Sequence, residues 1–164
     1  DAIGRDWQCG TLQVDFVLPE RLKASYIDIK GEKKQPVMLH RAILGSMERF
    51  IGVLIENTNG KLPIWLAPIQ IIVTNITEDS SKYAKEIYEN CVKNNLRTEL
   101  DLRNEKISYK VREHSNRKIP IIFVVGKNEM KDKSVSIRRL GSNNQEILPF
   151  KEAIAKIQNV AYML

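Results

Sequence analysis

The first 62 residues combine two strand-like segments with one amphipathic segment. Residues 8–17 and 36–44 have the alternation and the β-formers of strands, and the first turns a polar face toward a possible site. Residues 20–35, between them, are polar and rich in turn formers. A core-facing helix is predicted from the apolar spacing that follows, at Met47, Phe50, Ile51, Leu54 and Ile55. Asn59 and Gly60 predict its end.

After residue 63 the pattern becomes an alternation of strands and helices. Two β-branched runs, residues 69–76 and 119–126, predict strands that are buried on both faces. Further segments are predicted as strands at 97–102 and 134–140, and as helices from about residues 77, 106 and 150. The proline-flanked stretch 63–68 predicts a linker, so we expect domains at 1–62 and 63–164. The second has the element order of a three-layer α/β domain.

Composition places the chain among folded proteins. It has 164 residues, 43% hydrophobic and 28% charged, a balance that excludes intrinsic disorder. No apolar run reaches the roughly 20 residues that span a bilayer, so no membrane segment is expected. Cys9 and Cys91 lie far apart, which favours free thiols and a reducing, cytoplasmic location. Because the chain begins at Asp1 inside apparent structure, we expect it to be part of a longer protein.

The net charge of +6 is concentrated in the second half of the chain. Residues 66–164 contain 17 Lys and Arg against 12 Asp and Glu. A basic cluster lies within residues 103–118 and consists of Arg103, Lys106, Lys110, Arg112, Arg117 and Lys118. Such a cluster attracts polyanions such as nucleic acids, although a solvated helix face explains the charge equally well.

Two side chains of the first half are candidates for chemistry. His40 lies on a predicted strand, where a single histidine is more often a hydrogen-bonded structural residue than a metal ligand. A metal site needs three or four donors, and Cys9 and the distant His114 are the candidates to join it, so no complete site is expected in this chain. Arg49, at the start of the next helix, can bind an anion or pair with Glu48 or Glu56.

Several segments together resemble a known family. WQCGTLQVDF (7–16) and HRAILGSMERF (40–50) are similar to the end of the catalytic domain of threonyl-tRNA synthetases, which are class II aminoacyl-tRNA synthetases. GSMERF is similar to the third motif of that class. LAPIQIIVTNIT (66–77), DLRNEKISYKVREH (101–114) and IPIIFVVGKNE (119–129) resemble the family's anticodon-binding domain. The resemblance implies an α/β anticodon-binding domain with a mixed sheet flanked by helices, preceded by the terminal strands and helix of an antiparallel catalytic domain.

The resemblance also implies an activity, ATP-dependent activation of L-threonine and its transfer to tRNA(Thr). His40 is then one of three protein ligands of a zinc ion that binds threonine, with the other ligands outside this chain. Arg49 stacks on the adenine of Mg²⁺-bound ATP and faces its triphosphate. The threonine and adenylate pocket is lined by Gln8, Cys9, Thr11 and Gln13, with Ser46 near the nucleotide. The isolated chain is expected to be inactive.

For the second half, the resemblance implies recognition of the anticodon. Asn104, Glu129 and Arg138 match positions that read bases, and unpaired loop bases are commonly read in this way. Arg103, Lys106 and Lys118 are weaker candidates for contacts with the RNA, and Lys118 stands where an arginine is expected. The implied partners are tRNA(Thr), L-threonine, ATP and a second copy of the enzyme in a homodimer.

Two other interpretations are compatible with parts of the sequence. A non-catalytic, synthetase-like accessory module could share both domains and bind RNA without performing the reaction. A generic α/β nucleic-acid-binding domain explains the charge but not the two segments around Cys9 and His40. Cys9, His40 and Arg49 favour the enzyme, since a protein without the activity has no use for them.

Overall fold

The computed structural model describes residues 1–142 and 144–162. The chain divides into two compact units, Asp1–Asn59 and Gly60–Leu164. Within the described residues, no helix is both long enough and apolar enough to cross a membrane.

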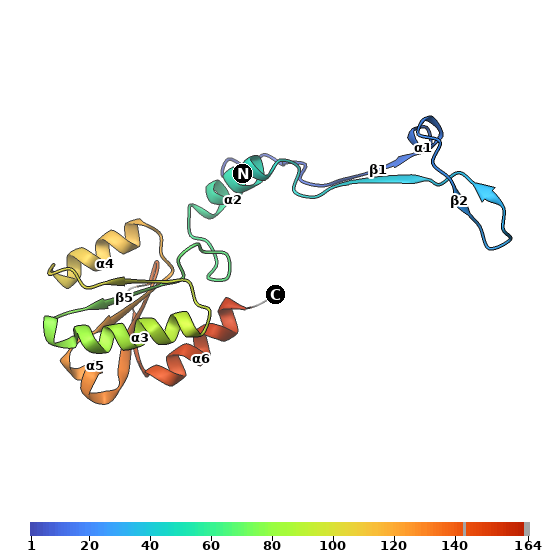
Figure 1. The fold of residues 1–164 in the computed structure, drawn as a ribbon. Helices are drawn as coiled ribbons and strands as arrows, with labels where there is room; N and C mark the ends of the chain where they lie inside the picture. The colour runs from blue at the N-terminus through green and yellow to red at the C-terminus, as the bar shows by residue number, and fades with distance from the viewer. Residues whose placement is uncertain (143, 163–164) are drawn as a thin grey trace. The chain divides into compact units, whose positions relative to one another are not determined.

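The first unit is built on an extended, two-stranded antiparallel ribbon (Figure 1). Its elements are, in order, β1 (Thr11–Asp15), α1 (Leu18–Arg21), β2 (Tyr26–Ile27), β3 (Lys33–Lys34), β4 (Met38–Ala42) and α2 (Met47–Thr58). β1 pairs with β4, and β2 pairs with β3 in the connection between them. Both long strands are shorter than their predicted ranges, and the α2 helix begins at the predicted residue.

Helix α2 starts and stops where its local chemistry requires. Ser46 is its N-cap, with extended backbone and a side chain that accepts a hydrogen bond from the Arg49 N–H. Asn59 ends the helix in the left-handed conformation (φ 52°), which asparagine tolerates better than most residues. The elements α1, β2 and β3 were not predicted, because each is too short to give a periodic pattern.

The second unit is a three-layer α/β domain. Its elements are β5 (Ile71–Asn75), η1 (Glu78–Ser80), α3 (Ser81–Lys93), β6 (Thr98–Asp101), α4 (Ile107–Asn116), β7 (Ile121–Val125), α5 (Lys127–Asp132), β8 (Ser134–Arg139), β9 (Gln145–Pro149) and α6 (Phe150–Ala161). The sheet order is β6-β5-β7-β8-β9, with β5 parallel to β6 and β7, and β8 antiparallel to β7 and β9. The predicted mixed sheet flanked by helices is therefore confirmed.

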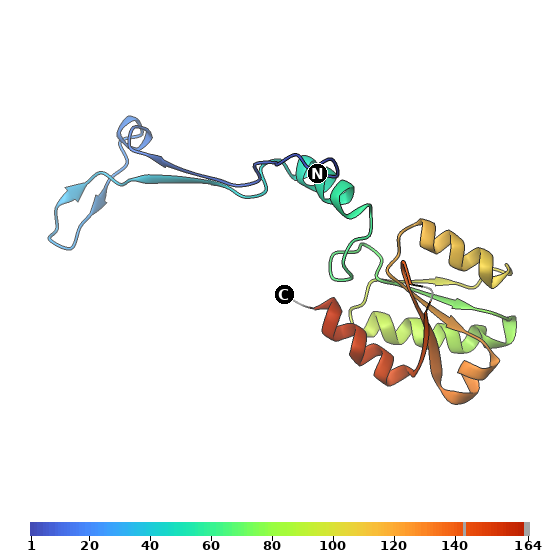
Figure 2. The ribbon, with the colours of Figure 1, turned by 180° about the vertical axis from the view of Figure 1, so that it is seen from behind.

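Helices cover the two faces of this sheet unequally (Figures 1 and 2). Helices α3 and α6 pack on one face, where the larger core includes Val73, Phe123 and Ile157. Helix α4 packs on the other face against a smaller core that contains Ile72, Ile122 and Val124 from β5 and β7. On the α4 face, Arg138 of β8 is partly exposed and Gln145 of β9 is exposed, whereas Ser134 and Ser136 of β8 are buried.

Two elements of this unit were missing from the predicted order. Helix α5 has six residues and starts directly after Gly126. This glycine was interpreted only as the end of a strand, although it is also the N-cap of the helix. Strand β9 is a five-residue segment that pairs only with β8. The final helix ends at Ala161, and residues 163–164 of its predicted range lie outside the described residues. Short elements such as these are fixed by tertiary pairing more than by local pattern.

Candidate functional site

One face of the β1–β4 ribbon collects the polar candidates of the first unit. Gln13 lies opposite His40 in the register, and Thr11 lies opposite Ala42. Because side chains alternate along a strand, these four share a face with Asp15 and Met38. A shallow pocket of about 410 Å³ on the ribbon is lined by Thr11, Gln13, His40, Arg41 and Ala42. The structure thus brings together three of the residues that the sequence suggested.

His40 is held by a carboxylate that sequence reasoning missed. Its Nε2 lies 3.2 Å from Asp15 Oδ2. The other oxygen of Asp15 accepts hydrogen bonds from the backbone N–H groups of Leu18 and Val17, which lower the pKa of this carboxyl and keep it charged. Asp15 lies two residues after Gln13 on the same strand, so its position in the alternating pattern was the available signal. Histidines that bind metals commonly have such a carboxylate partner.

The segment around Cys9 lies against the turn that precedes α2. Gly45 has φ +64°, and a Cβ built there would be 3.7 Å from the carbonyl oxygen of Cys9. A glycine therefore suits this turn for its conformation and for the close approach of two backbones. Gln8 Nε2 donates to Thr11 Oγ1 at 2.8 Å, and Cys9 Sγ lies 3.5 Å from the Trp7 carbonyl oxygen. Gln8 and Cys9 thus lie next to the glycine–serine turn, as a shared site requires.

Arg49 is not paired with Glu48 or Glu56 in the described residues. Its guanidinium carbon instead lies 5.7 Å from the centre of the Trp7 ring. Glu48 accepts a hydrogen bond from Ser46 Oγ at 2.7 Å, and this bond lowers the pKa of the glutamate. Trp7 also stacks with Arg5 and donates from Nε1 to Asp1 at 2.8 Å. The ring orients a planar cation on the first turn of α2, where the positive end of the helix dipole also favours anions.

The donors for a metal are incomplete within this chain. Among the described residues, no group of three or more His, Cys, Asp and Glu side chains is arranged to hold a metal ion. His40 itself fits the part of one ligand, since it is partly buried on a paired strand and has a carboxylate partner. Any metal bound here needs donors from elsewhere.

In the second unit, Asn104 and Glu129 lie at the edge where the parallel strands end. Asn104 is exposed in the loop between β6 and α4, and Lys106 is the exposed residue that precedes α4. Glu129 is in the first turn of α5, and its Oε2 accepts a hydrogen bond from the Gly126 N–H at 2.9 Å. The carboxyl ends of parallel strands are the usual place for binding residues in such sheets.

Arg138 lies farther along the sheet, on the face that α4 leaves partly open. It pairs in register with Ile122 and Gln145, and its Nη2 donates to Gln145 Oε1 at 2.9 Å. Gln145 also donates to Ser136 Oγ. A pocket of about 290 Å³ beside Arg138 is bordered by Val111 and Ser115 of α4. Sequence reasoning missed Gln145, because its strand was not predicted.

Lys118 is separated from Asn104 by the full length of α4. It follows the C-terminal end of the helix and adopts a left-handed conformation (φ 60°). A ten-residue helix is about 15 Å long, so Asn104 and Lys118 cannot contact the same base. The Lys118 side chain lies close to Gly60, since its Cγ is 3.3 Å from the position of a Cβ on that glycine.

The basic cluster is less uniform than its sequence suggested. Lys110 is buried, with 1% of its surface exposed. Arg103 forms salt bridges with Asp101 and Glu113, and Arg117 pairs with Glu99. In the part of the chain that the structure describes, Lys106, Arg112 and Lys118 are the exposed members that have no salt bridge. Of the six cations counted in this cluster, one is therefore buried and two are paired with carboxylates.

The buried carboxylate at the centre of this cluster is Asp101. Burial by itself raises the pKa of Asp101, but hydrogen bonds from Arg103 and His114 outweigh it and hold that pKa well below its usual value. His114 Nε2 lies 2.8 Å from Asp101 Oδ2, and its Nδ1 lies 3.4 Å from the guanidinium of Arg117. An arginine can only donate, so Nδ1 accepts and Nε2–H donates to Asp101.

We predict that this carboxylate makes the second unit sensitive to acid. Its folded-state pKa lies below the unfolded value of about 3.9, so its contribution to stability is complete above about pH 4 and is lost as the pH falls further. The free energy of unfolding of the 164-residue chain, measured with urea and circular dichroism from pH 2 to 7, should fall below pH 4. Asp101→Asn should be less stable than wild type at pH 7 and show a flatter acid limb. An acid limb of unchanged steepness in Asp101→Asn would contradict the assignment.

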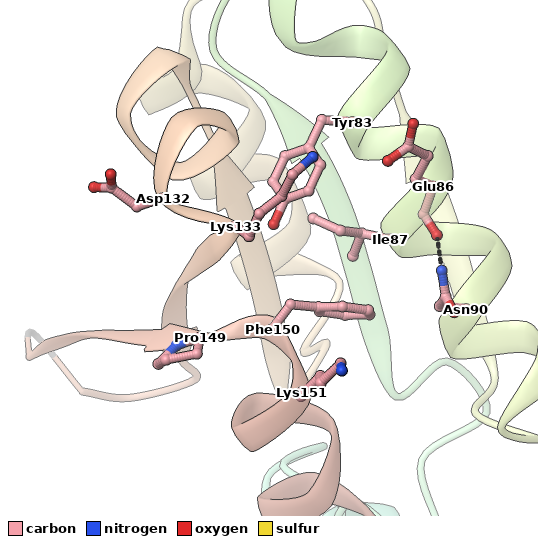
Figure 3. Close-up of a pocket in the computed structure, with 9 residues that line it drawn as sticks. All are labelled: Tyr83, Glu86, Ile87, Asn90, Asp132, Lys133, Pro149, Phe150 and Lys151. Carbon is pink, nitrogen blue, oxygen red and sulfur yellow. Dashed lines mark hydrogen bonds between the residues drawn. The ribbon is translucent and has the colours of Figure 1, made fainter.

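A further pocket lies on the opposite face of the sheet, between α3, α5 and the start of α6 (Figure 3). Its volume is about 380 Å³, and Tyr83, Ile87 and Phe150 face into it. Lys133 Nζ lies 5.1 Å from the centre of the Tyr83 ring, while the tyrosine hydroxyl donates to the Ser134 carbonyl oxygen at 3.0 Å. None of the residues predicted from sequence as site residues lines this pocket.

Comparison with known families assigns both parts of the chain. Residues 69–160 match the model of the anticodon binding domain, and residues 1–58 match the model of the tRNA synthetase class II core domain (G, H, P, S and T). The chain therefore belongs to the anticodon-binding-domain family of class II aminoacyl-tRNA synthetases.

Individual relatives narrow this class. A threonine–tRNA ligase from Paramagnetospirillum magneticum is 60% identical over 157 residues, which are 96% of this chain and 25% of that protein. One from Parvibaculum lavamentivorans is 61% identical over 161 residues, or 98% of this chain and 25% of that protein. The sequence thus matches the C-terminal region of threonyl-tRNA synthetases and spans about a quarter of the length of these relatives.

Solved structures agree with this placement. The RNA-binding domain of threonyl-tRNA synthetase from Cryptosporidium parvum superposes with a TM-score of 0.90 at 38% identity, over 99% of this chain and 41% of that one. A prolyl-tRNA synthetase from the same organism superposes with a TM-score of 0.75 at 24% identity, over 97% of this chain and 34% of that one, and this likeness concerns the fold alone.

Proposed function

We propose that this chain is the C-terminal part of a threonine–tRNA ligase, which activates L-threonine with ATP and transfers it to tRNA(Thr). The observation that carries the proposal is the polar face of the β1–β4 ribbon, where Gln13 lies opposite His40. The relatives support it, since the two described above are named threonine–tRNA ligases. The longer protein that contains this chain is called the full-length ligase below.

The exposed apolar side chains of the first unit support its membership in a larger domain. Of its residues, only Pro19 is buried, and Leu12, Val14 and Leu39 are each more than half exposed. A two-stranded ribbon is marginally stable in water unless its apolar face is covered. The remainder of a catalytic domain would supply that cover.

In this proposal His40 is one of the ligands of a zinc ion, and the other ligands come from outside this chain. When bound, zinc supplies a Lewis acid that can take the amino and hydroxyl groups of threonine. Asp15 orients the imidazole through Nε2. A site that engages a hydroxyl rejects valine far better than a site that relies on shape, because valine leaves the buried polar groups unpaired.

Gln8, Cys9, Thr11 and Gln13 line the threonine and adenylate pocket in this proposal, and Ser46 lies near the nucleotide. Arg49 places its flat guanidinium on the adenine of Mg²⁺-bound ATP, and its charge attracts the triphosphate. The stacking of Arg49 on Trp7 supports this role, because the ring orients the guanidinium before the substrate arrives.

The second unit selects the tRNA. Asn104 and Glu129 read bases at the strand edge, and Arg138 reads a base on the open sheet face. Lys106 and Lys118 are candidates for contacts with phosphates. Arg103 is a weaker candidate for such a contact, because two carboxylates already bind its guanidinium. Homodimer formation and a cytoplasmic location are further parts of the proposal and follow from the family resemblance.

We predict that Glu129→Ala and Arg138→Ala each raise the KM for tRNA(Thr) in the full-length ligase by about 5-fold to 100-fold, since one good base contact is worth about 1–3 kcal/mol. Threonine-dependent ATP–pyrophosphate exchange should stay within about twofold of wild type, because this half-reaction needs no tRNA. Lys85→Ala, an exposed charge on α3, is the matched control and should leave both measurements unchanged. Unchanged tRNA charging by both site variants would count against anticodon reading.

A non-catalytic, synthetase-like module remains the alternative function. It would bind tRNA in the same way, and the second unit alone does not distinguish the two. Threonine-dependent pyrophosphate exchange by the full-length protein separates them, since only the ligase performs it.

A further inference from the structure

Lys110 is a buried cation that the proposed function does not use. Only 1% of its surface is exposed, and it is among the largest fully buried side chains of the chain. Lysine is rarely buried completely unless its charge is paired. Burial lowers the pKa of Lys110, and the nearby charge of Asp101 opposes that shift.

The ammonium group of Lys110 joins the ends of two neighbouring strands. Its Nζ lies 3.0 Å from Asn75 Oδ1, 3.3 Å from the Asn75 carbonyl oxygen and 3.4 Å from the Asp101 carbonyl oxygen. Asn75 is the last residue of β5, and Asp101 is the last residue of β6. The amide of Asn75 is oriented for this contact, because its Nδ2 donates to Thr77 and Ser81.

From Asp101, the contacts lead to the loop that carries Asn104. One oxygen of the Asp101 carboxylate accepts from the Arg103 backbone N–H at 3.1 Å, and the carboxylate also binds the Arg103 guanidinium at 2.9 and 3.0 Å. The guanidinium is bound a second time by Glu113 of α4. The residue that precedes Asn104 is therefore fixed in both its backbone and its side chain.

From Asn75, a second series of contacts leads to Glu129. The next residue, Ile76, donates its backbone N–H to the Val125 carbonyl oxygen at 2.9 Å. Gly126 follows Val125, and its N–H donates to Glu129 Oε2. The Ile76 side chain lies against Gly126, because its Cδ1 is 2.9 Å from the position of a Cβ on that glycine. A movement of the end of β5 would therefore displace the start of α5.

We propose that Lys110 is a positioning residue for tRNA recognition: its buried ammonium joins the ends of β5 and β6 and thereby fixes the two loops that carry Asn104 and Glu129. This inference rests on the proposed anticodon-reading roles of those two residues. Lys110 itself touches no RNA, because its side chain is enclosed between α4 and the sheet.

The test is Lys110→Met in the full-length ligase, which keeps the length of the side chain and removes its three donors. We expect the KM for tRNA(Thr) to rise by about 10-fold to 100-fold, as displaced binding groups typically cause. Pyrophosphate exchange should stay within about twofold, because the ribbon site is untouched. Ile157→Val, in the core on the other face of the sheet, is the control for a general loss of stability and should leave the KM unchanged.

A double-mutant cycle separates positioning from a merely structural effect. In a background that carries Asn104→Ala and Glu129→Ala, Lys110→Met should change the KM by less than about twofold, since the groups it positions are gone. An equal rise in both backgrounds would overturn the inference. Asn75→Ser removes the Oδ1 acceptor, together with the Nδ2 donor to Thr77 and Ser81, and keeps the ammonium. It should show the same coupling with a smaller change in KM, and it serves as the test if Lys110→Met does not fold.

The outcomes for the inference and for the proposed function differ. If Asn104→Ala raises the KM while Lys110→Met and Asn75→Ser do not, positioning by Lys110 is wrong and anticodon reading stands. If Asn104→Ala and Glu129→Ala leave the KM unchanged, the anticodon-reading roles and the inference fail together.

Discussion

Arg49→Ala in the full-length ligase should lower kcat/KM for threonine-dependent ATP–pyrophosphate exchange by about 100-fold or more, the usual loss when a preorganised contact with developing charge is removed. The reason lies in two properties of Arg49. It is on the first turn of a capped helix, and its guanidinium is oriented by the Trp7 ring. Initial rates over a range of ATP concentrations measure the effect.

Two further variants separate charge from shape at this position. Arg49→Lys keeps the charge but loses the planar group, so it should recover only a small part of the activity. Arg5 is the other cation that stacks on Trp7, and its Nε forms a salt bridge of 2.7 Å with Asp1 Oδ2. Because this charge is already paired, Arg5→Ala should change the rate by less than about threefold. Equal losses for Arg5→Ala and Arg49→Ala would indicate that the stack around Trp7 is structural only.

The second large effect is expected at the histidine of the ribbon. His40→Ala in the full-length ligase should lower zinc affinity by more than about 100-fold. Loss of a residue that only hydrogen-bonds a metal ligand lowers the affinity by about 10-fold to 100-fold, and loss of the ligand itself should cost more. Threonine activation should fall with it, and the remaining activity should discriminate poorly between threonine and valine. Zinc content after dialysis, together with exchange rates for both amino acids, provides the measurement.

Asp15→Asn is the matched variant for His40→Ala. It keeps the shape of the side chain that contacts His40 and removes its charge, so the loss of zinc affinity should be smaller, about 10-fold to 100-fold. A His40→Ala protein with full zinc content and unchanged discrimination would exclude the metal role of this residue.

The strands that dominate both units were predictable for a simple physical reason. Ile71–Asn75 and Ile121–Val125 are buried along their whole length. Strands buried on both faces consist of nearly continuous β-branched residues, and such runs are easily recognised in a sequence. On the ribbon, the alternation of residues 8–17 predicted one polar face, and the register of the two strands then places Gln13 opposite His40. These features depend on the local sequence, and a pattern is sufficient to predict them.

The contacts that orient the candidate side chains could not be predicted in the same way. Asp15 reaches His40 from 25 positions away, and Lys110 reaches Asn75 across 35 positions. Lys110 looked like one member of a basic surface, but the packing of α4 turns it into the sheet. Contacts between distant segments depend on the register and on helix orientation, which composition and periodicity do not specify.

The most direct test of the proposed ligase activity is threonine-dependent ATP–pyrophosphate exchange by the full-length protein. Exchange should require threonine, be far weaker with valine and be lost in Arg49→Ala. A folded, tRNA-binding protein that shows no exchange with threonine would contradict it and would favour the non-catalytic module.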